Sequence, residues 1–118
     1  MSAQPRMPTE SGTPDHFQYL HPVMKRNYGQ WAWHDRPRPG VLHHVAKNGD
    51  ELWTVKAGTQ RQMDVYTIRD LCDIVDKFGE GHMRFTTRSN VEIGVADEKK
   101  VAPLIAKLET SGYPVGGT

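Results

Sequence analysis

Basic and hydroxyl side chains alternate along one short stretch of the chain, at Arg84, Thr86 and Arg88. Every second residue of a β-strand points to the same side, so Arg84 and Thr86 would share one face of a sheet, with Arg88 at its rim. Guanidinium groups bind carboxylates and oxyanions through paired hydrogen bonds, and a hydroxyl adds a donor. The stretch therefore predicts a site for a polyanion. The alternative is a solvated sheet face on which Glu92 neutralises Arg84.

A second basic pair lies upstream, where Lys56 and Arg61 bracket Gly58. Lys56 is expected on the same sheet face as Arg84, and the loop that follows could cradle an oxyanion with its backbone N–H groups. Gly94 is expected on this face too, where the missing side chain would let a flat ligand approach.

The sequence offers few groups for other chemistry. Cys72 is the single cysteine, which excludes a disulfide framework, a CxxC zinc site and a four-thiolate iron-sulfur cluster built by this chain alone. It falls on the apolar stripe of a predicted helix, so we expect it in the core. The six histidines lack metal-ligand spacing, and no metal site is predicted.

Length and charge limit the class of protein. The 118 residues fit one small domain, and a formal net charge of +1 gives no overall field for nucleic acid or a membrane. The sequence shows no signal peptide and no run of about 18 apolar residues, so no membrane span is predicted. Together with the lone cysteine, this indicates a cytoplasmic protein.

The first 40 residues give weak structural signals. Residues 1–14 are rich in Pro, Ser and Thr and are expected to form a mobile arm. Residues 17–28 favour a short helix that Pro22 interrupts. Residues 30–39 carry Trp31 and Trp33, and we expect an irregular segment whose tryptophans either pack locally on this domain or dock on another surface.

The rest of the chain gives clearer signals. Asn48-Gly49 favours a type I′ turn, and a loop at 88–90, with Asn90 left-handed and Thr87 opposite Val91, closes a second hairpin. Pro103 allows the last helix to begin nearer Val101 than its first polar residues suggest. The predicted strands are 41–46, 51–57, 82–87 and 91–95, and the predicted helices are 65–78 and 98–111.

From residue 51 this order is an α+β, ferredoxin-like βαββαβ unit that lacks its last strand. Residues 113–118 could begin that strand, or residues 41–46 could fill the vacant edge, and the sequence leaves both open. We expect an N-terminal arm and interface segment at 1–40 and a half-domain at 41–118 that is truncated at its C-terminal end.

The run RFTTRSNVE at 84–92 resembles the sirohaem-contacting strand of the sulfite and nitrite reductase family. Other segments resemble the branch of that family formed by the beta subunits of dissimilatory sulfite reductases. They are FQYLHP at 17–22, RPGVL at 38–42, IRDLCDI at 68–74 and GYPVGG at 112–117. The resemblance runs from about Ser11 to Thr118, nearly the whole chain.

The resemblance implies a half-domain that meets a pseudo-symmetric second half to enclose sirohaem coupled to a [4Fe-4S] cluster. The complete enzyme would perform the six-electron reduction of sulfite to sulfide. By match to the motif, Arg84, Thr86 and Arg88 would bind the sirohaem carboxylates. Lys56 or Arg61 would be the catalytic residue that binds sulfite and favours loss of its oxygens as water.

The resemblance also implies what lies outside these 118 residues. The cluster cysteines of the family belong to a later region, so this chain alone is not expected to be active. The expected partners are a homologous alpha subunit, in an assembly of two alpha and two beta subunits, and a small sulfur-carrier or electron-donor protein.

Two other classes fit parts of the pattern. An RNA-recognition module shares the order of elements, but residues 91–95 carry a carboxylate and a glycine where base stacking needs aromatic rings, so no nucleic-acid partner is expected. The stronger alternative is a stand-alone half-domain that binds an anionic tetrapyrrole, an oxyanion or a protein partner without catalysis.

Overall fold

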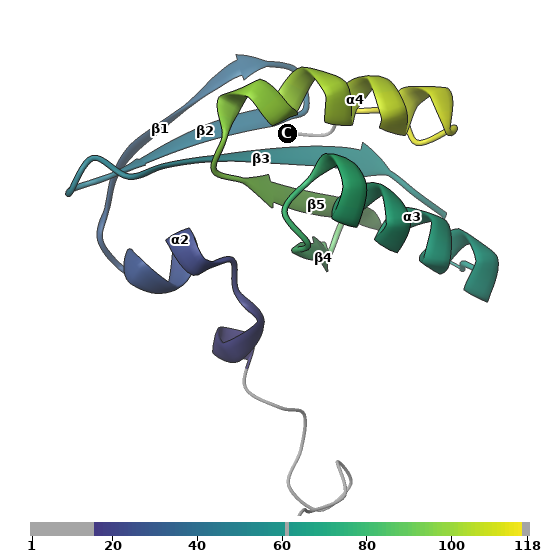
Figure 1. Cartoon of the computed structure of the whole chain (residues 1–118), viewed down its shortest axis with the longest axis horizontal. Coiled ribbons are helices and arrows are strands. Elements are labelled where there is room, and N and C mark those ends of the chain that lie inside the picture. The colour runs from purple at the N-terminus through teal and green to yellow at the C-terminus, as the bar shows by residue number, and fades with distance from the viewer. Residues whose placement is uncertain (1–15, 61, 117–118) are drawn as a thin grey trace, which may run out of the picture.

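The computed structural model describes residues 16–60 and 62–116, so the predicted mobile arm at 1–14 lies outside the described residues. Its centre is a five-stranded antiparallel sheet with the strand order β1-β2-β3-β5-β4 (Figure 1). The strands are β1 (Trp31–Arg38), β2 (Val41–Ala46), β3 (Glu51–Gly58), β4 (Met83–Phe85) and β5 (Asn90–Val95). The helices are η1 (His16–Tyr19), α2 (Pro22–Arg26), α3 (Val65–Phe78), η2 (Glu98–Lys100) and α4 (Val101–Thr110), where η denotes a 3₁₀-helix.

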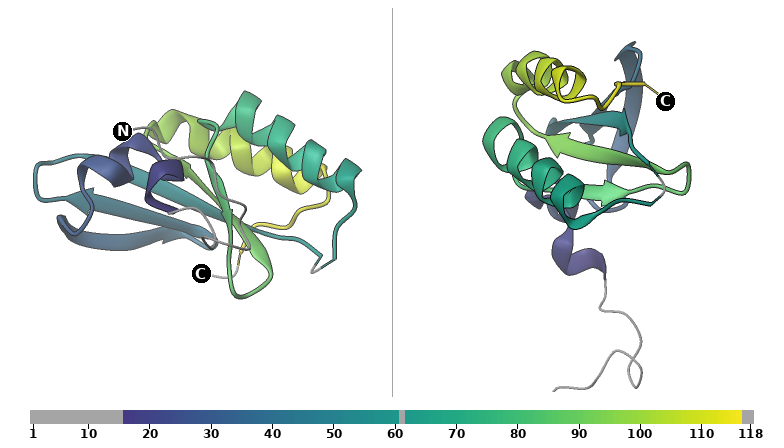
Figure 2. Two further views of the ribbon diagram at one scale, coloured as in Figure 1. Left: turned by 90° about the horizontal axis from the view of Figure 1, so that it is seen from below. Right: turned by 90° about the vertical axis from the view of Figure 1, so that its right-hand side faces the viewer.

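Helices α3 and α4 lie side by side on one face of the sheet, whereas η1 and α2 lie on the opposite side (Figures 1 and 2). The apolar core fills the space between the sheet and the two long helices. Its fully buried members include Val41, Val55, Ala57, Leu71, Val91, Ile93, Val95, Leu104 and Leu108. The predicted α+β, ferredoxin-like arrangement is confirmed.

Helix α3 has the predicted ends. The Asp64 carboxylate accepts a hydrogen bond of 2.8 Å from the Thr67 N–H at the start, and Gly79 follows the last turn. Leu71, Ile74 and Val75 face the core. The prediction that Cys72 lies in the core is wrong: the buried stripe runs through Ile74, and the thiol is exposed.

The last helix follows the alternative that Pro103 suggested. The 3₁₀ turn η2 comes first, and regular α-helix begins at Val101. Pro103 then lies in the first turn, where its missing N–H has no helical partner to lose. Leu104, Ile105 and Leu108 are buried, as their spacing predicted.

Both expected occupants share the vacant edge of β3. Strand β2 pairs with residues 51–55, and the C-terminal segment takes over beyond them, where Val115 forms a bridge with Ala57. The Gly58 N–H donates to the Pro114 carbonyl at 2.7 Å, and the Gly116 N–H donates to the Lys56 carbonyl at 3.0 Å. Residues 114–116 therefore occupy the position where the last strand of the ferredoxin-like unit would begin.

The prediction that residues 30–39 are irregular is wrong, because Trp31–Arg38 form β1 and pair with β2. This strand belongs to the sheet although it precedes the predicted boundary at residue 40. The single helix expected at 17–28 is also wrong. Pro22 begins a separate helix, α2, and the His21 side chain caps it by accepting the Val23 N–H at 3.1 Å.

The two hairpin turns differ from prediction. In the first, Gly49 has the predicted positive φ (94°) but Asn48 does not, and in the second the left-handed residue is Ser89 (φ 62°) rather than Asn90. Phe85, not Thr87, pairs with Val91. This register shift of two residues leaves every side chain on its predicted face, because side chains alternate with a period of two.

Residues 16–26, which we call the strap, are tied to the far end of the domain by Glu80. Its carboxylate accepts hydrogen bonds from the His21 Nε2 at 2.6 Å, the Ala96 N–H at 2.7 Å and the Lys100 Nζ at 3.1 Å. The His21 Nδ1 already accepts a backbone N–H, so the ring proton is on Nε2. Glu80 thus joins four segments of the chain.

Replacing Glu80 by Gln is expected to lower the free energy of unfolding by about 1 to 3 kcal/mol at pH 7. Burial raises the pKa of Glu80, but the hydrogen bonds from Ala96, His21 and Lys100 outweigh it and hold the pKa below its usual range. A lowered folded-state pKa contributes stability above the unfolded-state pKa and loses it as the pH falls through the folded value. In urea unfolding between pH 7 and pH 3, the free energy of unfolding should therefore fall less steeply with decreasing pH in the variant than in wild type. Parallel curves for the two proteins would contradict this role, and Glu98→Gln at an exposed site is the control.

Candidate anion-binding site

Three charged side chains form a row across neighbouring strands. Lys56 on β3 is paired in register with Glu92 on β5, which is paired with Arg84 on β4. The Arg84 Nε donates to Glu92 Oε1 at 3.0 Å, the Arg84 Nη2 donates to Glu92 Oε2 at 3.4 Å, and the Lys56 Nζ lies 3.7 Å from Glu92 Oε2. The expectation that Lys56 and Arg84 share a sheet face is confirmed, and so is the ion pair between Glu92 and Arg84.

The members of this row differ in exposure. The side chain of Glu92 is 9% exposed, that of Lys56 18%, and that of Arg84 66%. Glu92 occupies two of the five N–H donors of the guanidinium, so the outer edge of Arg84 can still bind a second oxyanion. The row carries two cations against one carboxylate and remains net positive.

Thr86 and Arg88 lie in the turn between β4 and β5. The Thr86 hydroxyl donates to the Asn90 side-chain oxygen and accepts the Arg88 N–H at 3.2 Å. Its proton is therefore engaged within the turn, where Thr86 fixes the backbone that carries the exposed Arg88 side chain. The structure brings Arg84, Lys56 and this turn to the same end of the sheet, whereas Arg61 lies outside the described residues.

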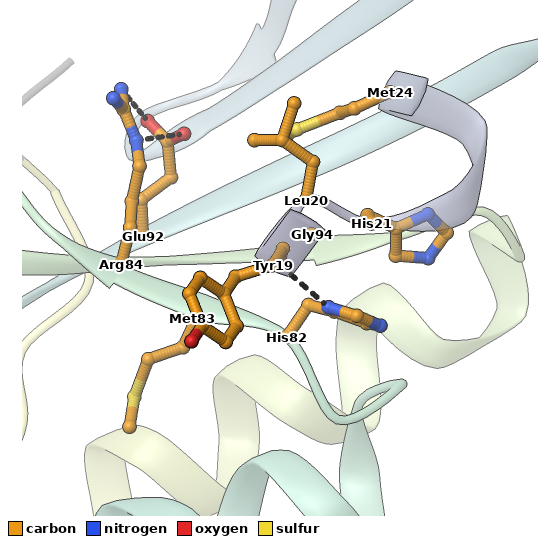
Figure 3. A pocket seen from close by; sticks show the side chains of 9 residues that line it. All are labelled: Tyr19, Leu20, His21, Met24, His82, Met83, Arg84, Glu92 and Gly94. Atoms are coloured by element: carbon orange, nitrogen blue, oxygen red, sulfur yellow. Dashed lines mark hydrogen bonds and ion pairs between the residues drawn. The ribbon is translucent and has the colours of Figure 1, made fainter. Parts of the chain in front are cut away.

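The sequence suggested that Gly94 is open to a flat ligand, but the strap covers it. A Cβ at Gly94 would meet Leu52, Met24 and His21 at 3.8 to 3.9 Å. The pocket between the strap and the sheet is only about 40 Å³, room for a few water molecules (Figure 3). A large planar ligand must therefore lie beyond the strap, toward the turn between β4 and β5.

Gly94→Ala tests this placement. The added methyl group meets its neighbours at ordinary van der Waals distances, so the free energy of unfolding should change by less than about 1 kcal/mol. Binding of an anionic ligand should be unchanged, because Met24 and His21 rather than the ligand cover this position. A loss of ligand binding in a stably folded Gly94→Ala chain, measured by absorption titration, would show that a ligand does contact Gly94.

Beside the row, the strap and sheet form a second hollow of about 240 Å³. The His44 Nε2 lies 3.1 Å from the Thr54 hydroxyl there, and Leu20, Met24 and Trp31 supply apolar walls. Burial lowers the pKa of His44, and the nearby Glu92 only partly offsets this, so His44 adds no positive charge at neutral pH. No pattern in the sequence predicts this wall, because it depends on how the strap packs.

The described residues place the charged row on this face without gathering a set of metal ligands. They contain no cluster of three or more His, Cys, Asp or Glu side chains placed to hold a metal ion. Among them there is also no helix with the length and apolar character to cross a membrane. The chemistry that the row of cations can perform is to bind and orient carboxylates or oxyanions.

Comparison with known proteins identifies the family of the chain. Residues 44–111 match the model of the family described as the nitrite/sulfite reductase ferredoxin-like half domain. The chain is also similar to proteins named sulfite reductase, dissimilatory-type subunit beta. Identity is 46% to the protein from Archaeoglobus fulgidus, 43% to that from Nitratidesulfovibrio vulgaris and 41% to that from Megalodesulfovibrio gigas.

Each of these similarities covers 93% of this chain, which confirms the resemblance recognised in the sequence. The chain spans 30%, 31% and 45% of the length of these three relatives, respectively. The family model covers more than half of the chain and includes β3, α3, β4, β5 and α4. The chain belongs to the nitrite/sulfite reductase ferredoxin-like half-domain family.

Proposed function

We propose that the chain is the amino-terminal part of the beta subunit of a dissimilatory sulfite reductase and that it binds sirohaem and sulfite in the reduction of sulfite to sulfide. Similarity over 93% of the chain to three proteins with this name supports the assignment. The structural observation that carries it is the net positive row of Lys56, Glu92 and Arg84, which opens toward the Arg88 turn.

The residues of this face fit a polycarboxylate macrocycle. Arg84 keeps its outer N–H groups for a carboxylate, and Arg88 extends from the adjoining turn. Thr86 contributes by holding that turn, and its hydroxyl reaches a ligand only by leaving Asn90. Strap residues Leu20 and Met24 offer an apolar wall beside the row, suited to the body of an amphipathic ring.

Lys56 is the residue we assign to the substrate oxyanion, with Arg61 as the second candidate. Lys56 is the least exposed cation of the row, and a shielded ammonium stabilises an oxyanion more strongly than one in bulk water. Sirohaem, when bound, would supply a redox-active iron, and the electrons for sulfur reduction would come from an external donor. The part assigned to this chain is to bind the carboxylates, to orient sulfite and to stabilise its negative charge.

The remaining parts of the proposal concern the whole protein. The [4Fe-4S] ligands would come from outside these 118 residues, and a homologous alpha subunit would complete the assembly of two alpha and two beta subunits. A small sulfur-carrier or electron-donor protein would act with it in the cytoplasm. The names of the relatives, which specify a beta subunit, support the existence of a partner subunit.

The experiment is to purify the protein that contains this segment anaerobically and to measure its absorption spectrum, iron content and sulfite-dependent oxidation of a reduced dye. We expect a sirohaem spectrum, iron beyond one atom per macrocycle and turnover with sulfite. A protein that folds and binds its partner but contains no tetrapyrrole would overturn the proposed function.

A further inference from the structure

The row of Lys56, Glu92 and Arg84 places an acid at the centre of a site for anions. Glu92 is the least exposed of the three, with 9% of its side chain accessible. A carboxylate there repels an incoming anion, so binding alone does not account for it. Its contacts with both cations offer a different explanation.

Glu92 determines how the two cations lie before any ligand arrives. It grips Arg84 through Nε and Nη2, which fixes the plane of a long and otherwise mobile side chain and directs the remaining N–H groups outward. On its other side it approaches the Lys56 Nζ at 3.7 Å. The Lys56 side chain is only 18% exposed, and the nearby carboxylate replaces part of the hydration that its ammonium group loses on burial.

Neighbouring groups do not replace Glu92 in this role. His44 faces it from β2, but burial lowers the pKa of His44 and leaves the ring neutral at pH 7. Thr54 and Gly94 form the adjacent positions on the same face and carry no charge. In the described part of the chain, Glu92 is therefore the acid that contacts both cations of the row.

We propose that Glu92 is a built-in counter-ion and positioning residue: it orients Lys56 and Arg84, and its charge competes with the bound anion for the same two cations. This inference rests on the proposed function, because it takes this face as the site for a polycarboxylate or oxyanion. It predicts opposite effects for two substitutions at one position, which a purely structural role would not produce.

The test is an absorption titration of the full 118-residue chain with uroporphyrin, a metal-free polycarboxylate tetrapyrrole. Glu92→Gln keeps an acceptor for Arg84 but removes the competing charge, so it should bind about tenfold tighter than wild type at low salt. Glu92→Asp keeps the charge but is too short to grip Arg84, so it should bind several-fold more weakly, as expected for a lost charge-assisted pair. Glu109→Gln, an exposed site on α4 with the same change in charge, should bind within about twofold of wild type.

A second measurement tests the role of Glu92 without any tetrapyrrole. Thermal unfolding in low salt should show Glu92→Gln melting below wild type, and inorganic sulfate should narrow that difference, because sulfate replaces the missing counter-charge. Sulfate should not narrow any difference shown by Glu109→Gln.

The outcomes discriminate between the two proposals. If wild type binds uroporphyrin and both Glu92 variants bind it equally well, the counter-ion inference is wrong and the anion site stands. If no variant binds uroporphyrin but sulfate rescues Glu92→Gln, the tetrapyrrole assignment fails and the role of Glu92 stands. If neither effect occurs, both are wrong.

Discussion

Replacing Arg84 and Arg88 together by Ala in the protein that contains this segment is expected to reduce its sirohaem content at least about tenfold. Each arginine can form a charge-assisted, paired hydrogen bond with a carboxylate of the macrocycle, and loss of two such contacts costs several kcal/mol. The domain should remain folded, because the Arg84 side chain is 66% exposed and an exposed ion pair adds little stability. The ratio of sirohaem absorbance to protein in the purified sample measures the effect.

The matched control is Lys99→Ala with Lys107→Ala, which removes two positive charges from exposed positions on η2 and α4. Both lie in the helical layer, away from the charged row, so sirohaem content should stay near that of wild type. Equal sirohaem content in the arginine variant and the control would show that Arg84 and Arg88 do not bind sirohaem.

Gly40→Ala is expected to cost about 3 kcal/mol or more of the free energy of unfolding. Gly40 has a φ of +81°, which an L side chain adopts only under strain, and its carbonyl accepts the Lys56 N–H at 2.8 Å. An added Cβ would lie 2.5 Å from Val115 Cγ1 and 2.6 Å from Gly116 N, so the C-terminal segment would have to leave the edge of β3. Urea unfolding, with hydrogen exchange at the Gly58 and Gly116 amides, measures both effects.

Gly29→Ala separates the two causes. Gly29 has a similar φ of +76°, but no atom lies within 4 Å of the place where its Cβ would be. This variant should lose only the conformational contribution, about 1 kcal/mol. Equal losses at Gly29 and Gly40 would show that the C-terminal segment does not press against Gly40.

The elements that could be predicted are those whose own side chains reveal their environment. Helix α3 has an apolar stripe, a capping aspartate and a terminal glycine, and all three act locally. Strand β1 has no such signal because most of its side chains are exposed, and its Pro37 argues against a strand. It forms because β2 supplies hydrogen bonds, and this pairing leaves no mark in the sequence of β1.

The candidate site likewise has features that could be predicted from the sequence and features that could not. The alignment of Lys56, Glu92 and Arg84 follows from the alternation of strand residues, which survives a register shift of two. The covering of Gly94 could not be predicted, since it depends on the strap and on a hydrogen bond between His21 and Glu80, residues 59 positions apart. The choice of Ser89 over Asn90 as the left-handed residue likewise depends on the turn that Thr86 stabilises.

The most direct test of the central claim is an anaerobic native mass spectrum of the protein isolated from its source. The mass of the chain and the mass of any bound cofactor are read from the same ions. We expect a chain that extends beyond these 118 residues, associated with a second subunit and carrying sirohaem and an iron-sulfur cluster. A 118-residue chain with no tetrapyrrole would contradict the reductase assignment.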